Sequence, residues 1–220
     1  MNQPSSQSSS QSSLLLALHS SSETLGVGVQ APGAEPRIAS FPLGRQLSND
    51  LLPCVEELLP AEHWPQLGRL VVATGPGGFT GTRLTVVLAR TLAQQLSIPL
   101  HGFSSFLLMA RRHWAMQPWP PHQRLWLQQP LPRRGVVAGA YSPDPQALGG
   151  VAEALEPRLY RSGEAWPGDG SGDEPCLEAV VEPQADVRQL LELGQLADAA
   201  GLPGPWEPVL PLYPTSPVER

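Results

Sequence analysis

The chain has 220 residues, of which 41% are hydrophobic and 15% are charged, and its formal net charge is −6. This length and apolar content predict a globular protein with a substantial core, and the acidic balance argues against a large basic footprint for nucleic acid. The sequence has no run of about 18 apolar residues, which excludes a transmembrane helix.

Residues 1–13 are mostly Ser and Gln, and we interpret this low-complexity segment as a disordered tail. It has no Lys or Arg, and the apolar run behind it is short, which argues against a signal peptide. Residues 14–18 predict a buried strand that ends in a polar turn. Alternating apolar residues predict further strands at 24–30 and 37–41, which would complete an antiparallel meander.

His19 stands at the end of the first predicted strand. We expect a structural histidine whose ring is satisfied by the following turn. The alternative is a general base or a metal ligand. A neutral imidazole does not supply the anionic oxygen that Mg²⁺ prefers.

A first helix is predicted at 46–59, because apolar residues recur there at helical spacing. The core stripe of this helix is Leu47, Leu51, Cys54 and Leu58. Three further apolar residues widen the stripe on its flank: Leu52, Val55 and Leu59. The two cysteines, Cys54 and Cys176, form no C-x-x-C pattern, so we expect reduced thiols, as in a cytoplasmic protein.

A buried strand at 70–73 leads into a glycine-rich loop and a helix at 84–96. The loop reads Gly75, Pro76, Gly77, Gly78, Phe79, Thr80, Gly81, Thr82 and Arg83. We expect a structural turn, because glycines permit positive φ and close backbone approach. A phosphate cradle at the helix N-terminus is the alternative. No Lys follows Gly81, and Thr80 stands where a third dinucleotide-binding glycine would be, so neither common phosphate motif is matched.

The helix at 84–96 has more apolar surface than one sheet contact requires. Val86, Ala89, Leu92, Ala93 and Leu96 form the face expected to cover the sheet. A second face of this helix carries further apolar residues. Together with the flank of the first helix, these residues predict an exposed interface patch. The patch consists of Leu52, Val55, Leu59, Leu84, Val87 and Thr91.

A strand at 97–102 and a helix at 106–114, capped by Ser104 or Ser105, follow. We expect Arg111, Arg112 and His113 to lie on a solvated rim at the end of this helix; contact with RNA, beside Trp114, Trp119 and Trp126, is the alternative. The more proline-rich second half predicts less regular structure. Its expected parts are strands at 124–128 and 135–141, a surface loop at 168–173, a helix at 187–200 and an extended segment at 203–217.

The glycine loop resembles the G-P-G-S-F-T-G-x-R signature of the TsaB (YeaZ) family, with Gly78 in place of serine. Residues 16–23 resemble the opening L-A-L/I-D-T-S/A-T-E of that family, with His19 in place of aspartate. The resemblance implies an α/β fold of two half-domains of the actin/sugar-kinase/heat-shock-ATPase (ribonuclease H-like) type, the second one eroded. The expected division is a half-domain at 14–114, a linker at 115–123 and a reduced half-domain at 124–220.

The family resemblance also implies a function. It implies a non-catalytic dimerisation subunit of the machinery that makes threonylcarbamoyladenosine beside the tRNA anticodon. Such a subunit binds the TsaD transferase through the interface patch, meets the TsaE ATPase through the complex, and self-associates when alone. It is expected to reach tRNA only through the transferase, to need no cofactor or metal, and to contact no membrane.

Two other classes of protein are the alternatives. A kinase or ATPase of the same fold would need an acidic residue at position 19 and a second acidic phosphate motif, and neither is present. A metalloprotease would need paired ligands such as H-E-x-x-H, and the five histidines do not show that spacing.

Overall fold

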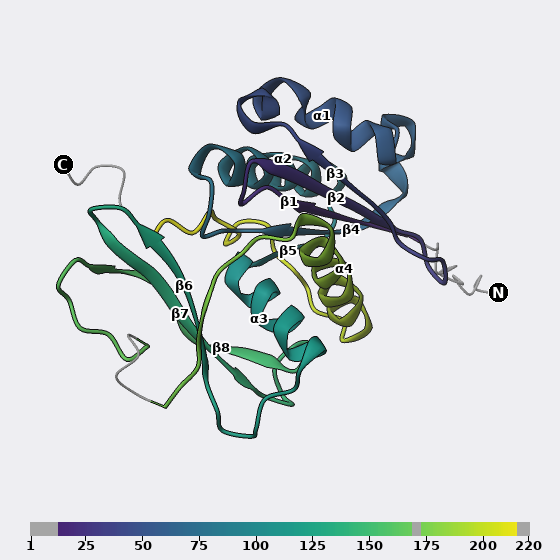
Figure 1. The fold of residues 1–220 in the computed structure, drawn as a ribbon. Coiled ribbons are helices and arrows are strands. Elements are labelled where there is room, and N and C mark those ends of the chain that lie inside the picture. The colour runs from purple at the N-terminus through teal and green to yellow at the C-terminus, as the bar shows by residue number, and fades with distance from the viewer. Residues whose placement is uncertain (1–12, 169–172, 215–220) are drawn as a thin grey trace.

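The computed structural model describes residues 13–168 and 173–214. The tail predicted at 1–13 therefore lies outside the described residues except for Ser13, as do most of the loop predicted at 168–173 and the end of the segment predicted at 203–217. The described chain forms two lobes, each built on one β-sheet (Figure 1).

The first lobe carries a five-stranded sheet in the order β3-β2-β1-β4-β5. Strands β1, β2 and β3 form an antiparallel meander, and β4 and β5 continue the sheet parallel to β1. Its elements are β1 (Leu14–His19), β2 (Thr24–Gln30), β3 (Arg37–Pro42), η1 (Gly44–Gln46), α1 (Leu47–Leu58), η2 (Ala61–Gln66), β4 (Leu67–Ala73), α2 (Phe79–Leu96) and β5 (Leu100–Phe103).

The first sheet is buried on both faces, which explains the continuous apolar run of β1. Leu16 and Leu18 pack in the core under α1 and α2, whereas Leu15 and Ala17 pack on the other face with α4. On β2 the glycines face α4: a Cβ on Gly28 would stand 2.5 Å from a methyl of Val187. The alternation predicted for this strand is therefore confirmed, and its glycines permit the close approach of a helix.

The second lobe carries a four-stranded sheet in the order β8-β7-β6-β9. Its inner face packs on α3, whereas Trp166, from the segment between β8 and β9, packs against the outer face beside Trp126 and Tyr160. The remaining elements are α3 (Ser105–Met116), β6 (Leu125–Leu131), β7 (Gly135–Pro143), β8 (Val151–Arg161), β9 (Cys176–Glu178) and α4 (Pro183–Ala199).

The two lobes exchange helices. Helix α3 follows the last strand of the first sheet but packs on the second, and α4 follows the second sheet but packs on the first. The two helices contact each other between the sheets (Figure 1). Figure 1 shows α1 and α2 on the opposite side of the first sheet from α4. The expected α/β fold class, with a reduced second half, is confirmed.

Several elements differ from the predictions. Strand β8 was not predicted, because Pro157 and four charged residues interrupt its apolar pattern. As an edge strand, it tolerates that proline. Helix α2 begins at Phe79 rather than at residue 84, and α4 begins at Pro183 rather than at residue 187. Proline is favoured at the first helical position, so Pro183 starts α4 without loss of a helical hydrogen bond.

Candidate functional site

The glycine loop packs directly against the turn between β1 and β2. The Gly78 N–H donates a hydrogen bond to the Ser21 carbonyl at 2.8 Å. A Cβ on Gly77 would stand 2.2 Å from that same oxygen, and a Cβ on Gly81 would stand 2.6 Å from the Ser20 carbonyl. Backbone acceptors therefore face these glycines, which favours the structural turn over the phosphate cradle, since a phosphate needs donors.

The other residues of the loop divide between the core and the surface. Gly75 and Pro76 are buried, whereas Thr80 and Arg83 are exposed. Phe79 is 45% exposed, and its ring lies 4.8 Å from that of Tyr213. The tail of the chain holds the loop from the other side, because the Leu212 N–H donates to the Thr74 carbonyl at 2.7 Å.

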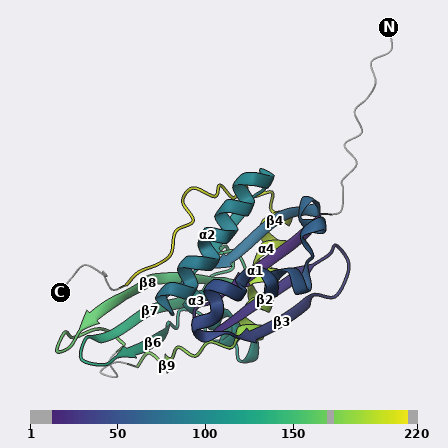
Figure 2. The ribbon, with the colours of Figure 1, turned by 90° about the horizontal axis from the view of Figure 1, so that it is seen from above.

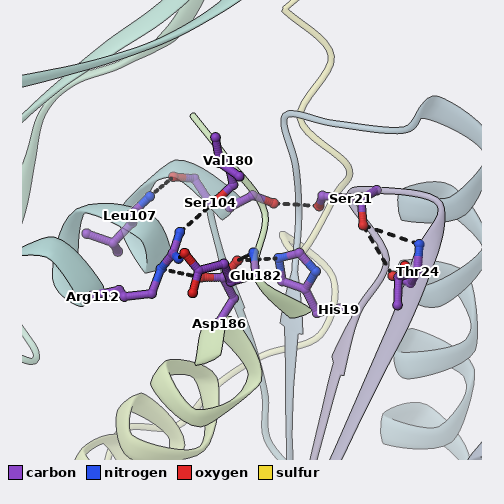
Figure 3. Close-up of polar contacts among 11 residues, drawn as sticks. His19, Ser21, Thr24, Ser104, Leu107, Arg112, Val180, Glu182 and Asp186 are labelled. Atoms are coloured by element: carbon purple, nitrogen blue, oxygen red, sulfur yellow. Dashed lines mark hydrogen bonds and ion pairs between the residues drawn. The ribbon is translucent and has the colours of Figure 1, made fainter. Parts of the chain in front are cut away.

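A buried cluster of ionisable side chains lies where the two lobes meet (Figure 3). His19 ends β1, Arg112 comes from α3, and Asp186 comes from the first turns of α4. The Arg112 Nε lies 3.2 Å from the Asp186 Oδ1, and the His19 Nε2 lies 4.0 Å from the Asp186 Oδ2. Arg112 also pairs with Glu182 and donates to the Val180 carbonyl at 2.6 Å.

Burial controls the protonation of this cluster. Burial, reinforced by the charge of Arg112, lowers the pKa of His19 from 6.5 to about 4. Burial also raises the pKa of Asp186 from 3.8 to about 6, although the Arg112 charge and the Glu182 N–H oppose this shift. Near pH 7 the cluster therefore contains a neutral imidazole and a carboxylate paired with arginine.

The expectation for His19 was wrong in one respect. Its ring is completely buried, and within the described residues neither ring nitrogen has a hydrogen-bond partner. The turn does not satisfy it; the ring instead faces the Asp186 carboxylate, which the sequence separates from it by more than 160 positions.

Hydroxyl groups connect the lobes beside this cluster. Ser21, in the turn after β1, shares a 2.5 Å hydrogen bond with Ser105 at the start of α3. Ser104 caps α3 by accepting from the Leu107 N–H at 3.0 Å, as predicted, and donates to Glu153 of β8 at 2.7 Å. The Tyr141 hydroxyl donates to the same carboxylate at 2.9 Å, and burial raises the pKa of Glu153.

A cleft of about 790 Å³ opens between the lobes in front of the glycine loop. The first lobe contributes the β1–β2 turn, Arg45 and the first turn of α2, and the second lobe contributes Gln129, Glu178 and residues 179–181. Neither His19 nor Asp186 lines this cleft. The buried carboxylate is therefore turned away from the space that a substrate could enter.

The predicted interface patch lies only partly at the surface. Leu52 and Val87 are 45% and 52% exposed, Thr91 is exposed, and Leu84 is half-buried. Val55 and Leu59 are buried in the core under α1, so their assignment to an exposed flank was wrong. The face of α1 that covers the sheet is therefore wider than one stripe.

The basic patch predicted at the end of α3 is not a surface. Arg111 and Arg112 are buried: Arg111 binds the Gly149 and Gln189 carbonyls and Glu192, while Arg112 belongs to the cluster. Trp126 is also completely buried. Both the solvated rim and the RNA contact were therefore wrong for these residues. Sequence analysis missed Asp186, whose only sequence signal is an acidic residue on the apolar side of a helix.

Comparison with known proteins gives concordant matches. Residues 26–121 match the family model described as "TsaD: tRNA N6-adenosine threonylcarbamoyltransferase". The chain is 37% identical over 98 residues to the "tRNA threonylcarbamoyladenosine biosynthesis protein TsaB" of Bacillus subtilis, and 29% identical over 103 residues to the protein of that name in Escherichia coli. These alignments cover 44% and 46% of this chain and 43% and 44% of the relatives, so the chain spans less than half of either curated relative.

Solved structures agree with these matches over a greater length. "YeaZ from Pseudomonas aeruginosa" superposes with a TM-score of 0.69 and 25% identity, covering 91% of this chain and 99% of that chain. A second structure, an uncharacterized protein with similarity to peptidase YEAZ from the same organism, gives a TM-score of 0.71 at 24% identity, covering 92% of this chain and 100% of that chain. The resemblance found in the glycine loop is thereby confirmed.

Proposed function

We propose that this chain, which belongs to the TsaB/YeaZ family, acts in tRNA threonylcarbamoyladenosine biosynthesis as a non-catalytic subunit that binds a TsaD-like transferase. The names of its curated relatives support the pathway. The proposed assembly reaches a TsaE-like ATPase through the transferase complex, and the isolated chain self-associates through the same surface. The proposal also includes the expected division of the chain into a half-domain at 14–114, a linker at 115–123 and a reduced half-domain at 124–220.

The buried cluster at the lobe junction supports the proposal that the chain is non-catalytic. In catalytic members of this superfamily an aspartate ends the first strand, and here the buried His19 stands at that place. The nearest carboxylate, Asp186, is completely buried and bound by Arg112, so it offers no oxygen to the cleft. We therefore expect no magnesium-dependent ATP hydrolysis above background. Turnover that disappears in His19→Ala would instead favour a kinase or ATPase of the same fold.

The exposed apolar side chains of α1 and α2 support the binding surface. Both helices already bury one face on the first sheet, and Leu52 and Val87 remain outside that core. Exposed apolar residues on neighbouring helices are typical of protein interfaces. A two-fold homodimer requires a self-complementary surface, which an apolar helix pair can supply.

Calorimetry with a purified TsaD-like transferase tests the surface. Val87→Glu should weaken association by about 1–3 kcal/mol, because it places an unpaired charge in an apolar contact. Leu196→Glu is the matched control, since Leu196 is 41% exposed on α4, on the opposite side of the sheet. Equal affinity for the wild type and a folded Leu84→Glu/Val87→Glu variant would place the interface elsewhere.

A further inference from the structure

The free end of the second sheet gathers positive charge in an otherwise acidic protein. The turn between β6 and β7 contains Arg133 and Arg134, and the last residues of β8 contain Arg158 and Arg161. We call these four residues the arginine tip. Within residues 131–135 and 158–164 the only acidic residue is Glu164. The chain has a net charge of −6 and no lysine, so all of its side-chain cations apart from histidine are guanidinium groups.

Backbone pairing brings the two segments of the tip together. Gly135 is the register partner of Arg161, and the Ser162 N–H donates to the Arg134 carbonyl at 3.3 Å. In Figure 2 the arrowhead of β8 marks this end of the sheet, which projects away from α1 and α2. A partner could therefore occupy the tip without covering the proposed transferase surface.

The turn holds an arginine in an unfavourable backbone conformation, because Arg133 has φ of 65°. That left-handed conformation favours Gly, Asn or Asp, and another residue is destabilising there by about 1 kcal/mol. Among the described residues neither Arg133 nor Arg134 forms an ion pair, and both are exposed. Their guanidinium groups are thus available to an external anion.

A half-buried aromatic side chain, Trp166, adjoins the arginines and packs on the buried ring of Tyr160. The Arg158 guanidinium pairs with Glu164 at 3.4 Å and lies 3.9 Å from the centroid of the Tyr160 ring. Tyr160 contacts Trp166 with ring centroids 5.4 Å apart. Arginine forks bind phosphates in bidentate geometry, and arginine planes and aromatic rings stack on unpaired bases. At physiological salt the Debye length is about 8 Å, so distant carboxylates of this acidic chain are largely screened at the tip.

We propose that the arginine tip is a binding surface for RNA, in which Arg133 and Arg134 contact phosphates and Trp166 contacts an unpaired base. This inference deepens the proposed function, because it gives the chain a direct contact with RNA in addition to the contact made through the transferase. The arginine–aromatic combination favours RNA over an acidic protein surface, which would need only the charges.

Fluorescence anisotropy with a labelled tRNA transcript tests the proposal on the full-length chain alone. The wild type should bind with a Kd of about 1–100 µM at physiological salt. Arg133→Asn/Arg134→Gln should weaken binding at least about fivefold and reduce the slope of log K against log salt by about 1–2. Because Asn suits the left-handed position, this variant should melt no lower than the wild type, which separates the loss of binding from a loss of folding.

Arg37→Gln/Arg188→Gln is the control, because it removes two exposed arginines from β3 and α4, away from the tip. Unchanged RNA binding in this control supports the proposal. An equal loss in both double variants, no loss in the tip variant, or equally effective competition by polyglutamate and unlabelled tRNA would overturn it. Calorimetry with the transferase, without RNA, should give equal affinities for the tip variant and the wild type. Failure of RNA binding is thereby distinguishable from failure of the proposed subunit role.

Discussion

The two lobes begin alike and end differently. Each opens with three antiparallel strands, β1–β3 in the first lobe and β6–β8 in the second, followed by a strand parallel to the first of the three. Between the third and fourth strands the first lobe places α1, whereas the second places a segment that carries Trp166. A large aromatic side chain buries about 150–250 Å², so Trp166 covers part of the face that a helix would cover.

This difference shows which elements cover the sheet of the reduced lobe. The first sheet is covered by α1 and α2 on one face and by α4 on the other. Within the described residues, the helix that covers the second sheet is α3, which comes from the first half of the chain. The lobes are therefore not independent, and the cluster of His19, Arg112 and Asp186 lies at the junction where the exchanged helices meet.

The largest effect should come from breaking that junction. Arg112→Met leaves the completely buried Asp186 carboxylate without its cation. Removal of one partner of a buried ion pair is destabilising by about 3–5 kcal/mol. Urea denaturation should show this decrease in the free energy of unfolding, with both lobes unfolding together.

The double variant Arg112→Met/Asp186→Leu is the matched control for this prediction. It removes both charges and leaves apolar groups of similar size, so it should be more stable than the single variant. A single variant within about 1 kcal/mol of the wild type would show that the junction does not depend on this pair.

The second prediction concerns the glycine loop of the first lobe. Gly77→Val introduces a branched side chain whose Cβ would stand only 2.2 Å from the Ser21 carbonyl oxygen. Overpacking of this kind is destabilising by about 1–3 kcal/mol, and it should lower the melting temperature and transferase affinity together. Gly78→Ala is the control, because its Cβ would have no neighbour nearer than 3.7 Å. Retained stability with a lost affinity for nucleotide would restore the phosphate cradle.

The first half of the chain was predictable because its signals are local. Alternation in β2, the helical stripe Leu47, Leu51 and Leu58 in α1, and the cap Ser104 of α3 each lie within one element and appear as predicted. Strand β8 escaped prediction because its position depends on pairing with β7, and Pro157 resembles a loop signal when that pairing is unknown.

The junction could not be predicted for a related reason. His19, Arg112 and Asp186 are brought together by the packing of α4 on β1 and of α3 on α4, and none has a sequence neighbour that indicates its partner. The burial of Val55 was missed because a helical wheel gives the direction of a side chain but not the width of the surface that covers it. Long-range polar contacts and the limits of a packed face therefore require the fold itself.

The third prediction uses the pH dependence of the junction. From pH 6.5 down to about 4, His19 binds a proton in the unfolded chain but not in the folded chain, so its contribution to stability falls on acidification. Asp186 binds a proton below about pH 6 when folded and below 3.8 when unfolded, so its contribution rises on acidification. Between pH 6 and 4 the two contributions nearly cancel in the wild type.

Single substitutions should expose each contribution in chemical denaturation at several pH values. Between pH 6 and pH 4.5 the free energy of unfolding of Asp186→Asn should fall by about 1–2 kcal/mol relative to that of the wild type. Each group changes this free energy by at most about 1.4 kcal/mol per pH unit. His19→Gln should show the opposite slope relative to the wild type. Parallel curves for all three proteins would mean that these groups do not titrate as their burial requires.

The smallest effect is expected at the N-terminus of α2, where this chain departs from the family signature. Gly78 is the N-cap of α2 and provides no side-chain acceptor for the first turn. A Cβ there meets nothing closer than the Ser22 carbonyl at 3.7 Å, so serine fits without displacing the turn. Gly78→Ser should therefore stabilise the protein by a few tenths of a kcal/mol, because its hydroxyl can accept from a free N–H of α2. Thermal melting against Gly78→Ala, which has a Cβ but no acceptor, isolates the cap. If Gly78→Ser were no more stable than Gly78→Ala, solvent rather than a side chain would accept the hydrogen bonds of the first turn of α2. The glycine would then not destabilise the first lobe.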